Sequence, residues 1–230
     1  MRSIRMPQRR VFLCLQGPHG PFFSSLARQL ERAGAEVWRV GFNAGDQMFW
    51  HRKDRFIAFR DDPDDWPSRC AALFDELNVT DLVIYGDTRP IHANAVQLAD
   101  ARQIAVHSFE EGYLRPYWVT YELGGTNGHS PLMRMSLTEI LTAMDRKGAD
   151  APPPPCHWGD MRDHIFWGAA YHGLVLAFNQ GYPKFRPHRS LRVAQEFKLY
   201  LKRFLLMPLH AIDRWRATRA VRRGSFPYHV

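Results

Sequence analysis

The chain has 230 residues, of which 45% are hydrophobic and 23% charged, and a formal net charge of +8. This composition is typical of a globular protein with one large or two small domains, and it excludes an intrinsically disordered chain. The apolar runs are far shorter than the roughly 20 residues of a membrane helix, and no signal-peptide core is recognisable, so we expect a cytoplasmic protein.

The first half of the chain predicts alternating strands and helices. Residues 10–16 read as a strand, Ser24 and Ser25 as helix caps, Gly34 as a helix stop, and 36–40 as a second strand. Further along, the pattern predicts a helix at 68–77, a strand at 81–85, a helix at 92–102 and a strand at 104–108. Such alternation predicts an α/β fold, a doubly wound, Rossmann-like parallel sheet, over residues 1–150.

The second half is predicted to be mainly helical. After an extended stretch at 117–122 and a loop at 124–130, the apolar spacing predicts a helix at 136–146. Prolines at 152–155 indicate a linker, and helices are predicted at 163–179, at 188–206 with a break near Pro208, and at 211–223. We therefore expect a helical linker and basic segment at 151–223, with 224–230 as the start of a truncated second domain.

The positive charge is concentrated near the end of the chain. Between Lys184 and Arg223 there are 12 Lys or Arg and two acidic residues, so this segment carries the whole excess. Its basic residues alternate with leucine and aromatic side chains, a mixture that suits an anionic membrane surface. The alternative is a helix that packs its apolar stripe between domains. Nucleic-acid binding is not expected, because no readout motif is visible.

Two strand ends near the beginning of the chain carry candidate binding residues. The loop at 16–23, with Gln16, Gly17 and Gly20, lies between a predicted strand and a helix, where backbone amides favour anions and hydroxyls. It is neither a dinucleotide fingerprint nor a P-loop, and the alternative is a structural turn. Asp87, Arg89 and His92 follow the next buried strand as a second candidate group, or alternatively as a loop ion pair with a capping residue.

Glu110 and Glu111 are the main catalytic candidates. They follow a predicted buried strand and precede Gly112 and Arg115 in what reads as a polar loop. Arg115 would keep one carboxylate ionised, and the proximity of the two would raise the pKa of the other, so that it carries a proton. The alternative is a structural ion pair. Three widely spaced cysteines predict neither a disulfide framework nor a zinc motif, and no metal or other cofactor is expected.

Five motifs in order resemble the capsule polysaccharide biosynthesis/export protein family, most of all its smaller β-Kdo transferases of lipid-linked capsules. The motifs are Leu-Gln-Gly-Pro at 15–18 with Gly-Pro-Phe-Phe at 20–23, Phe-Asn-Ala-Gly-Asp at 42–46, Tyr-Gly-Asp-Thr-Arg at 85–89, Phe-Glu-Glu-Gly-Tyr-Leu-Arg-Pro at 109–116 and Gly-Gly-Thr-Asn-Gly at 124–128. Gly112, Tyr113, Arg115 and Asn127, which lie in the last two of these motifs, complete the set of expected substrate-binding residues.

The resemblance implies a glycosyltransferase of the GT-B type that transfers Kdo from CMP-Kdo to a lyso-phosphatidylglycerol acceptor. It further implies a peripheral position on the inner face of the cytoplasmic membrane and contact with capsule assembly and export proteins. The nucleophilic Asp of related enzymes is expected beyond Val230, so that this chain alone would be inactive. Two alternatives are a non-catalytic subunit of a capsule assembly/export complex and another nucleotide-binding α/β enzyme.

Overall fold

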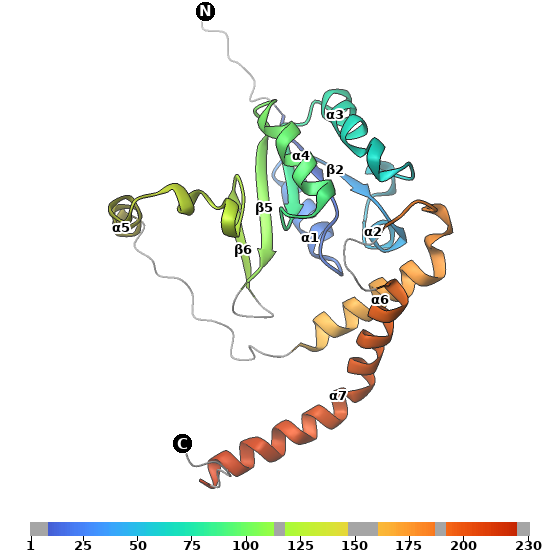
Figure 1. Ribbon diagram of the computed structural model, residues 1–230, viewed down its shortest axis with the longest axis vertical. Helices are drawn as coiled ribbons and strands as arrows, with labels where there is room; N and C mark the ends of the chain where they lie inside the picture. Colours follow the sequence, from blue (N-terminus) through green and yellow to red (C-terminus); the bar gives the residue numbers. More distant parts are fainter. Residues whose placement is uncertain (1–8, 113–117, 147–160, 187–191, 225–230) are drawn as a thin grey trace, which may run out of the picture.

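The structure is a computed structural model that describes residues 9–112, 118–146, 161–186 and 192–224 (Figure 1). The strands of the described residues are β1 (Val11–Cys14), β2 (Glu36–Gly41), β3 (Phe56–Ala58), β4 (Asp81–Tyr85), β5 (Ala105–Glu111) and β6 (Val119–Leu123). The α-helices are α1 (Phe22–Arg32), α2 (Ala44–Met48), α3 (Trp66–Leu77), α4 (Pro90–Asp100), α5 (Leu137–Arg146), α6 (Arg162–Phe178) and α7 (Val193–Arg222).

The strands form one sheet in the order β3-β2-β1-β4-β5-β6. The first five strands are parallel, and β6 is antiparallel to β5 at one edge. From β1 to β3 the strands are added toward one edge of the sheet, and from β4 to β6 toward the other edge. The boundary between β1 and β4 is therefore the topological switch point of the sheet. The predicted α/β class with a Rossmann-like parallel sheet is therefore confirmed.

Helices cover both faces of the sheet because successive strand side chains point in opposite directions. Leu13, Leu82 and Ile84 face α3 and α4 and belong to the larger apolar core. Phe12 and Val83 face α1, in a smaller cluster on the opposite side. Near-continuous apolar strands are what a sheet covered on both faces requires, so the doubly wound arrangement follows from the sequence of the strands.

Several local features differ from what the sequence predicts. Helix α1 starts at Phe22 without a side-chain cap, and Ser24 instead donates a hydrogen bond to the Phe49 carbonyl oxygen. Strand β5 continues to Glu111, so the two glutamates belong to the strand and not to the loop after it. The short elements β3 and α2 were not predicted, because three and five residues are too few to show a periodic pattern.

Helices α6 and α7 pack against each other below the carboxyl ends of the strands (Figure 1). The contact is close because Gly168 of α6 has no side chain: a Cβ atom there would lie 2.1 Å from the Tyr200 ring. Helix α7 runs without interruption through Pro208, so the predicted break there was wrong. A proline removes a single backbone hydrogen bond, and a long helix accommodates it by bending.

The sequence predicts two domain boundaries, and both fall mainly outside the residues that the structure describes. The expected boundary after residue 150 falls within 147–160, and the expected start of a second domain falls largely within 225–230, and both ranges lie outside the described residues. No helix in the part of the chain that the structure describes is both long and apolar enough to cross a membrane.

Candidate functional site

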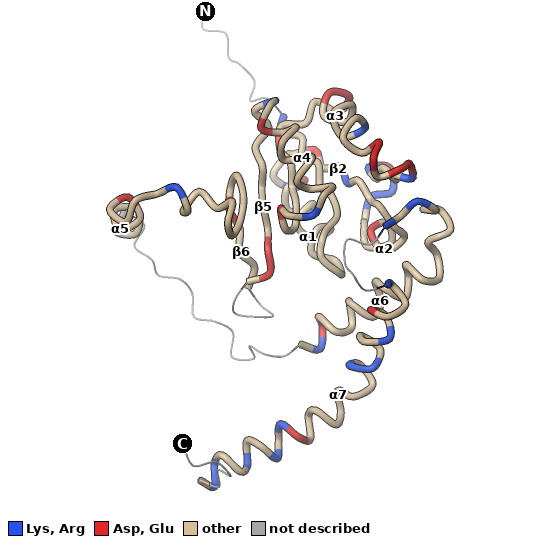
Figure 2. Tube along the Cα trace, viewed as in Figure 1, with Lys and Arg blue, Asp and Glu red and all other residues tan. Residues whose placement is uncertain are grey.

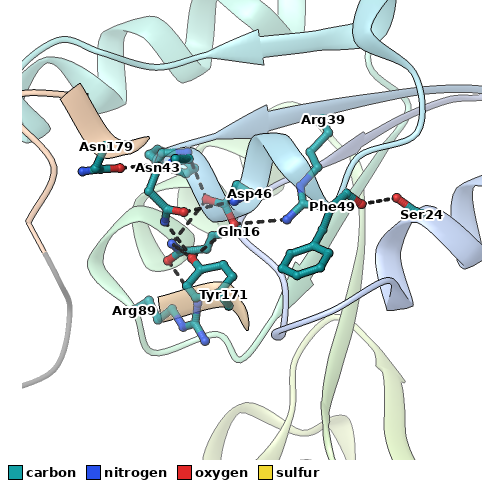
Figure 3. A network of polar contacts seen from close by, with 11 residues as sticks. Gln16, Ser24, Arg39, Asn43, Asp46, Phe49, Arg89, Tyr171 and Asn179 are labelled. Atoms are coloured by element: carbon teal, nitrogen blue, oxygen red, sulfur yellow. Dashed lines mark hydrogen bonds and ion pairs between the residues drawn. The ribbon is translucent and has the colours of Figure 1, made fainter. Parts of the chain in front are cut away.

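A buried polar network lies at the carboxyl edge of the sheet, beside the switch point (Figure 3). Its centre is Asp46 of α2, which is fully buried. The carboxylate accepts hydrogen bonds from Arg39 Nη2 at 3.1 Å, from the Phe42 backbone N–H at 3.0 Å and from Gln16 Nε2 at 3.4 Å. Gln16 in turn accepts a 3.1 Å hydrogen bond from Arg89 Nη1, which joins the ends of β1 and β4.

Helix α6 contributes Tyr171 to the same network (Figure 3). The tyrosine hydroxyl accepts hydrogen bonds from Asn43 Nδ2 at 2.7 Å and from Gln16 Nε2 at 3.3 Å, and donates to Asp46 Oδ1 at 3.4 Å. Gly45 makes room for the ring, since a Cβ atom there would lie 2.6 Å from it. The loops that follow β1, β2 and β4 are thus tied to a helix that begins more than 70 residues further along the chain.

The electrostatics of the network fit a structural role. Burial raises the pKa of Asp46 above its usual value, and the charge of Arg39 opposes this rise. Burial and the charge of Asp46 raise the pKa of the Tyr171 hydroxyl as well. A buried carboxylate with these partners has little capacity left for a further ligand, so the network acts mainly to hold the loops in place.

A second polar cluster surrounds the carboxyl ends of β4 and β5. The loop after β6 folds back so that the Thr126 backbone N–H donates to Asp87 Oδ2 at 3.0 Å and the Thr126 hydroxyl donates to Glu110 Oε2 at 3.2 Å. The Asn127 side-chain amide also donates to Glu110, and His129 Nδ1 lies 3.1 Å from Asp87 Oδ2. We call these five residues the carboxylate cluster.

The two neighbouring glutamates point to opposite faces of the sheet, because β5 includes both. Glu110 belongs to the carboxylate cluster, whereas Glu111 pairs with His164 of α6 at 3.7 Å. The structure therefore does not place the two carboxylates side by side, as the sequence analysis expected. Of the two, Glu110 is the one that shares a site with other predicted residues, Asp87 and Asn127.

The remaining predicted residues fall into three groups. Gln16 and Arg89 belong to the buried network, and His92 is buried with Nδ1 against the Gly86 carbonyl oxygen of its own turn. The glycines allow close packing: an added Cβ atom at Gly17, Gly20 or Gly112 would lie 2.6 Å from Phe23, 2.8 Å from Trp167 or 2.5 Å from the Trp118 carbonyl oxygen. Tyr113 and Arg115 lie outside the described residues.

Sequence reasoning missed four members of the buried network: Arg39, Asn43, Asp46 and Tyr171. A signal for two of them was present. Asn43 followed by Asp46 three positions later is a helix-start pattern, and the Asn43 side chain does accept a hydrogen bond from the Asp46 N–H at the start of α2. Arg39 and Tyr171 lie in an apolar strand and an apolar helix, where no local pattern marks a buried polar partner.

Among the described residues there is no group of three or more His, Cys, Asp or Glu side chains arranged to hold a metal ion. Cys14 and Cys70 are buried free thiols, and burial raises the pKa of each to about 12. Thiols in this state are poor metal ligands and poor nucleophiles, because both roles require the thiolate.

The comparisons with known proteins agree on one family. The family model described as capsule polysaccharide biosynthesis protein matches residues 80–224. The chain is 31% identical over 210 residues to the capsule polysaccharide export protein KpsS of Escherichia coli, covering 88% of this chain and 51% of that protein. It is 40% identical over 145 residues to the capsule polysaccharide modification protein LipB of Neisseria meningitidis serogroup A, covering 62% of this chain and 35% of LipB. The chain thus spans about half the length of KpsS and a smaller share of LipB.

Proposed function

Because this chain belongs to the capsule polysaccharide biosynthesis protein family, we propose that it is part of a glycosyltransferase that transfers Kdo from CMP-Kdo to a lyso-phosphatidylglycerol acceptor. The product would be the first unit of the β-Kdo linker that anchors a capsule to lipid. In this proposal the described sheet holds the acceptor, and the donor site with its nucleophilic Asp belongs to a second domain of a GT-B architecture.

The observation that carries the proposal is the carboxylate cluster. Asp87 follows β4, and Glu110 lies near the end of the neighbouring strand β5. Thr126 donates hydrogen bonds to both carboxylates, and all three residues lie within the stretch that matches the family model. Open α/β sheets bind ligands at this edge. Carboxylates held by neutral donors accept hydrogen bonds from sugar or glycerol hydroxyls, and a glutamate near a reacting hydroxyl is a suitable general base.

The test is a Kdo-transfer assay with CMP-Kdo and a short-chain lyso-phosphatidylglycerol. The 230-residue chain is assayed beside a longer form that spans the full length of the relatives, and we expect activity in the longer form alone. In that form Glu110→Gln should lower kcat at least about 100-fold, the usual contribution of a general base. Glu76→Gln, at an exposed glutamate of α3, is the matched control and should leave the rate unchanged. A folded longer form without transfer activity would contradict the proposal.

A second part of the proposal concerns α7 and an anionic membrane surface. Lys and Arg residues occur in two groups on α7, at 198–203 and at 214–222 (Figure 2). Between residues 201 and 215, α7 also exposes a stripe of apolar side chains, namely Leu201, Phe204, Leu205, Leu209, Ile212 and Trp215. A helix with this mixture lies in a lipid interface, with apolar groups inserted and basic groups near anionic headgroups. This position would bring the sheet to the inner face of the cytoplasmic membrane, where a lipid acceptor is available.

The exposed surface of α7 also favours a second candidate function, a non-catalytic, membrane-associated subunit of a capsule assembly and export complex. That function needs the helix surface but not the carboxylate cluster. The same glutamate variant separates the two: Glu110→Gln should lower capsule formation in cells if the protein is the enzyme, through the loss of at least about 100-fold in kcat, and should leave it unchanged if the subunit is non-catalytic.

A further inference from the structure

A cavity of about 230 Å³ opens at the carboxyl edge of the sheet, apart from the carboxylate cluster. Phe42 follows β2, Phe59 follows β3, and both are buried wall residues of the cavity. Ile91 of α4 and Phe185 complete the apolar walls. The segment that carries Phe185 is held in place, since the Phe185 N–H donates to the Tyr182 carbonyl oxygen at 3.1 Å and the Tyr182 hydroxyl donates to Gln47 at 3.0 Å.

The inner end of the cavity offers little to a polar ligand. Gln16 is the polar side chain at that end, and its amide is already engaged: Nε2 donates toward Asp46 and Tyr171, and Oε1 accepts from Arg89. A nucleobase or a sugar ring placed between the phenylalanine walls would lose hydrogen bonds to water without replacement from side chains there. An aliphatic chain has no such loss, and it gains from the removal of apolar surface from water.

The mouth of the cavity has a different character. Lys184 and Arg186 lie there with a single carboxylate, Asp61, among the described residues that line the cavity. Lys184 is more than half exposed, and its Nζ atom is 3.9 Å from Asp62, so it remains able to turn toward a ligand. The volume is slightly below the roughly 300–1,000 Å³ of sites that enclose a whole drug-sized ligand. The cavity is therefore suited to one part of a larger molecule.

We propose that this cavity takes the aliphatic chain of an anionic amphiphile, with its phosphate facing Lys184 and Arg186. The choice of a phosphate head group rests on the proposed function, in which the acceptor is a phospholipid. The inference adds the place where the aliphatic chain of that acceptor would bind. Apolar contact with Phe42, Phe59 and Phe185 would supply affinity. The two cations would select an anionic head over a neutral one.

The cavity has a natural reporter in Trp66. Its ring lies 4.9 Å from the Phe42 ring and 5.2 Å from the Phe59 ring, centroid to centroid, directly behind the wall. We would label the seven tryptophans with 5-fluorotryptophan, assign Trp66 by Trp66→Phe, and titrate hexyl phosphate below its micelle concentration. The expected result is a saturable shift of the Trp66 ¹⁹F resonance. Inorganic phosphate and CMP should not shift it, and hexanol should bind more weakly than hexyl phosphate.

Variants test the two ends of the cavity separately. Lys184→Gln with Arg186→Gln should weaken hexyl phosphate binding about tenfold or more, a typical effect of losing charged hydrogen-bond donors, and leave hexanol unaffected. Lys198→Gln with Arg203→Gln, on α7, is the charge-matched control. Ile91→Phe should abolish binding by filling the cavity, whereas Ile212→Phe, on the exposed side of α7, should have no effect. If Ile91→Phe does not fold, Phe185→Ala removes a wall and should weaken binding.

Several outcomes would overturn the inference: a Trp66 shift with CMP and none with hexyl phosphate, equal affinity for hexanol and hexyl phosphate, or unchanged binding in the cavity variants. Because this assay needs no transfer, its failure is distinct from that of the proposed function. If the protein binds hexyl phosphate but does not transfer Kdo, the proposed ligand of the cavity stands and the proposed transferase function is contradicted. If the protein transfers Kdo but does not bind hexyl phosphate, the transferase function stands and the proposed ligand of the cavity is contradicted.

Discussion

The Asn43 side-chain amide donates a 2.7 Å hydrogen bond to the Tyr171 hydroxyl, although the two residues are 128 positions apart in the sequence. The bond connects the loop after β2 with α6, and α6 in turn packs against α7. Helix α6, together with the part of α7 that packs on it, therefore belongs to the architecture of the sheet edge. A change in α6 or α7 is expected to reach the loops that hold Gln16 and Arg89.

Tyr171→Phe removes the acceptor for two buried amides, those of Asn43 and Gln16. Leaving buried donors unsatisfied costs about 1–3 kcal/mol, so the free energy of unfolding should fall by that amount. Urea unfolding followed by circular dichroism measures it. Tyr121→Phe is the control, because its hydroxyl bonds to His107 at an exposed position where water replaces the lost partner. Equal losses in the two variants would show that the network does not stabilise the fold.

Gly168→Ala should separate α6 from α7. The added Cβ atom would lie 2.1 Å from the Tyr200 ring, and relief of this overlap requires the helices to move apart, at a typical cost of about 1–3 kcal/mol. Thermal unfolding reports the loss, and the emission of Trp167, the residue next to Gly168 in α6, reports the local change. Gly181→Ala has no atom within 4 Å of its new methyl group and should be close to neutral. A neutral Gly168→Ala would mean that the two helices are not closely packed.

Asp81 should contribute a pH-dependent stabilisation. Burial raises the pKa of this carboxyl, but hydrogen bonds from Arg10, Thr80 and His107 outweigh burial, so its pKa in the folded protein is lowered. An acid with a lowered folded pKa stabilises the fold fully above its unfolded pKa of about 3.9, and this stabilisation is lost as the pH falls through the folded value.

Asp81→Asn should accordingly be less stable than the wild type at pH 6, and the difference should shrink as the pH falls below about 4. Urea midpoints at pH 6, 4 and 3 measure it. Asp100→Asn, at an exposed carboxylate at the end of α4, is the control. If the difference in urea midpoint between the wild type and Asp81→Asn stays constant from pH 6 to pH 3, ionised Asp81 is not the source of the pH-dependent stabilisation.

Charge reversal on the outer part of α7 tests the proposed membrane surface. Each basic residue near an anionic surface contributes about 1 kcal/mol, so Arg214→Glu, Arg216→Glu and Arg219→Glu together should weaken vesicle binding at least about 100-fold. Sedimentation with phosphatidylglycerol-containing vesicles measures it, and the effect should be larger at low salt because screening is weaker. Reversal of Arg28, Arg32 and Arg102, on or next to α1 and α4, should have a much smaller effect. Unchanged binding in the α7 variant would leave the helix with a packing role.

Local sequence pattern was a reliable guide wherever an element packs an apolar face. The strand Asp81–Tyr85 was predicted with its observed bounds, because a continuous apolar run between polar residues leaves few other options. The strand that ends in Glu111 was predicted to end three residues too early, at Ser108. Its last two residues are polar, and they remain part of the strand because they pair with β6, whose following loop returns to cover Glu110. That partner is distant in sequence, so no local rule could extend the strand.

The sequence by itself determined the parallel α/β sheet, the presence of polar side chains at its carboxyl edge, and the concentration of charge near the end of the chain. Each depends on the period of apolar side chains or on composition, which are properties of short segments. The tertiary structure alone decided which polar groups meet: Asp46 with Arg39, Gln16 with Arg89, Glu110 with Asn127 rather than with Glu111. A buried polar group must find a partner, but the partner is chosen by the packing of elements that the chain separates widely.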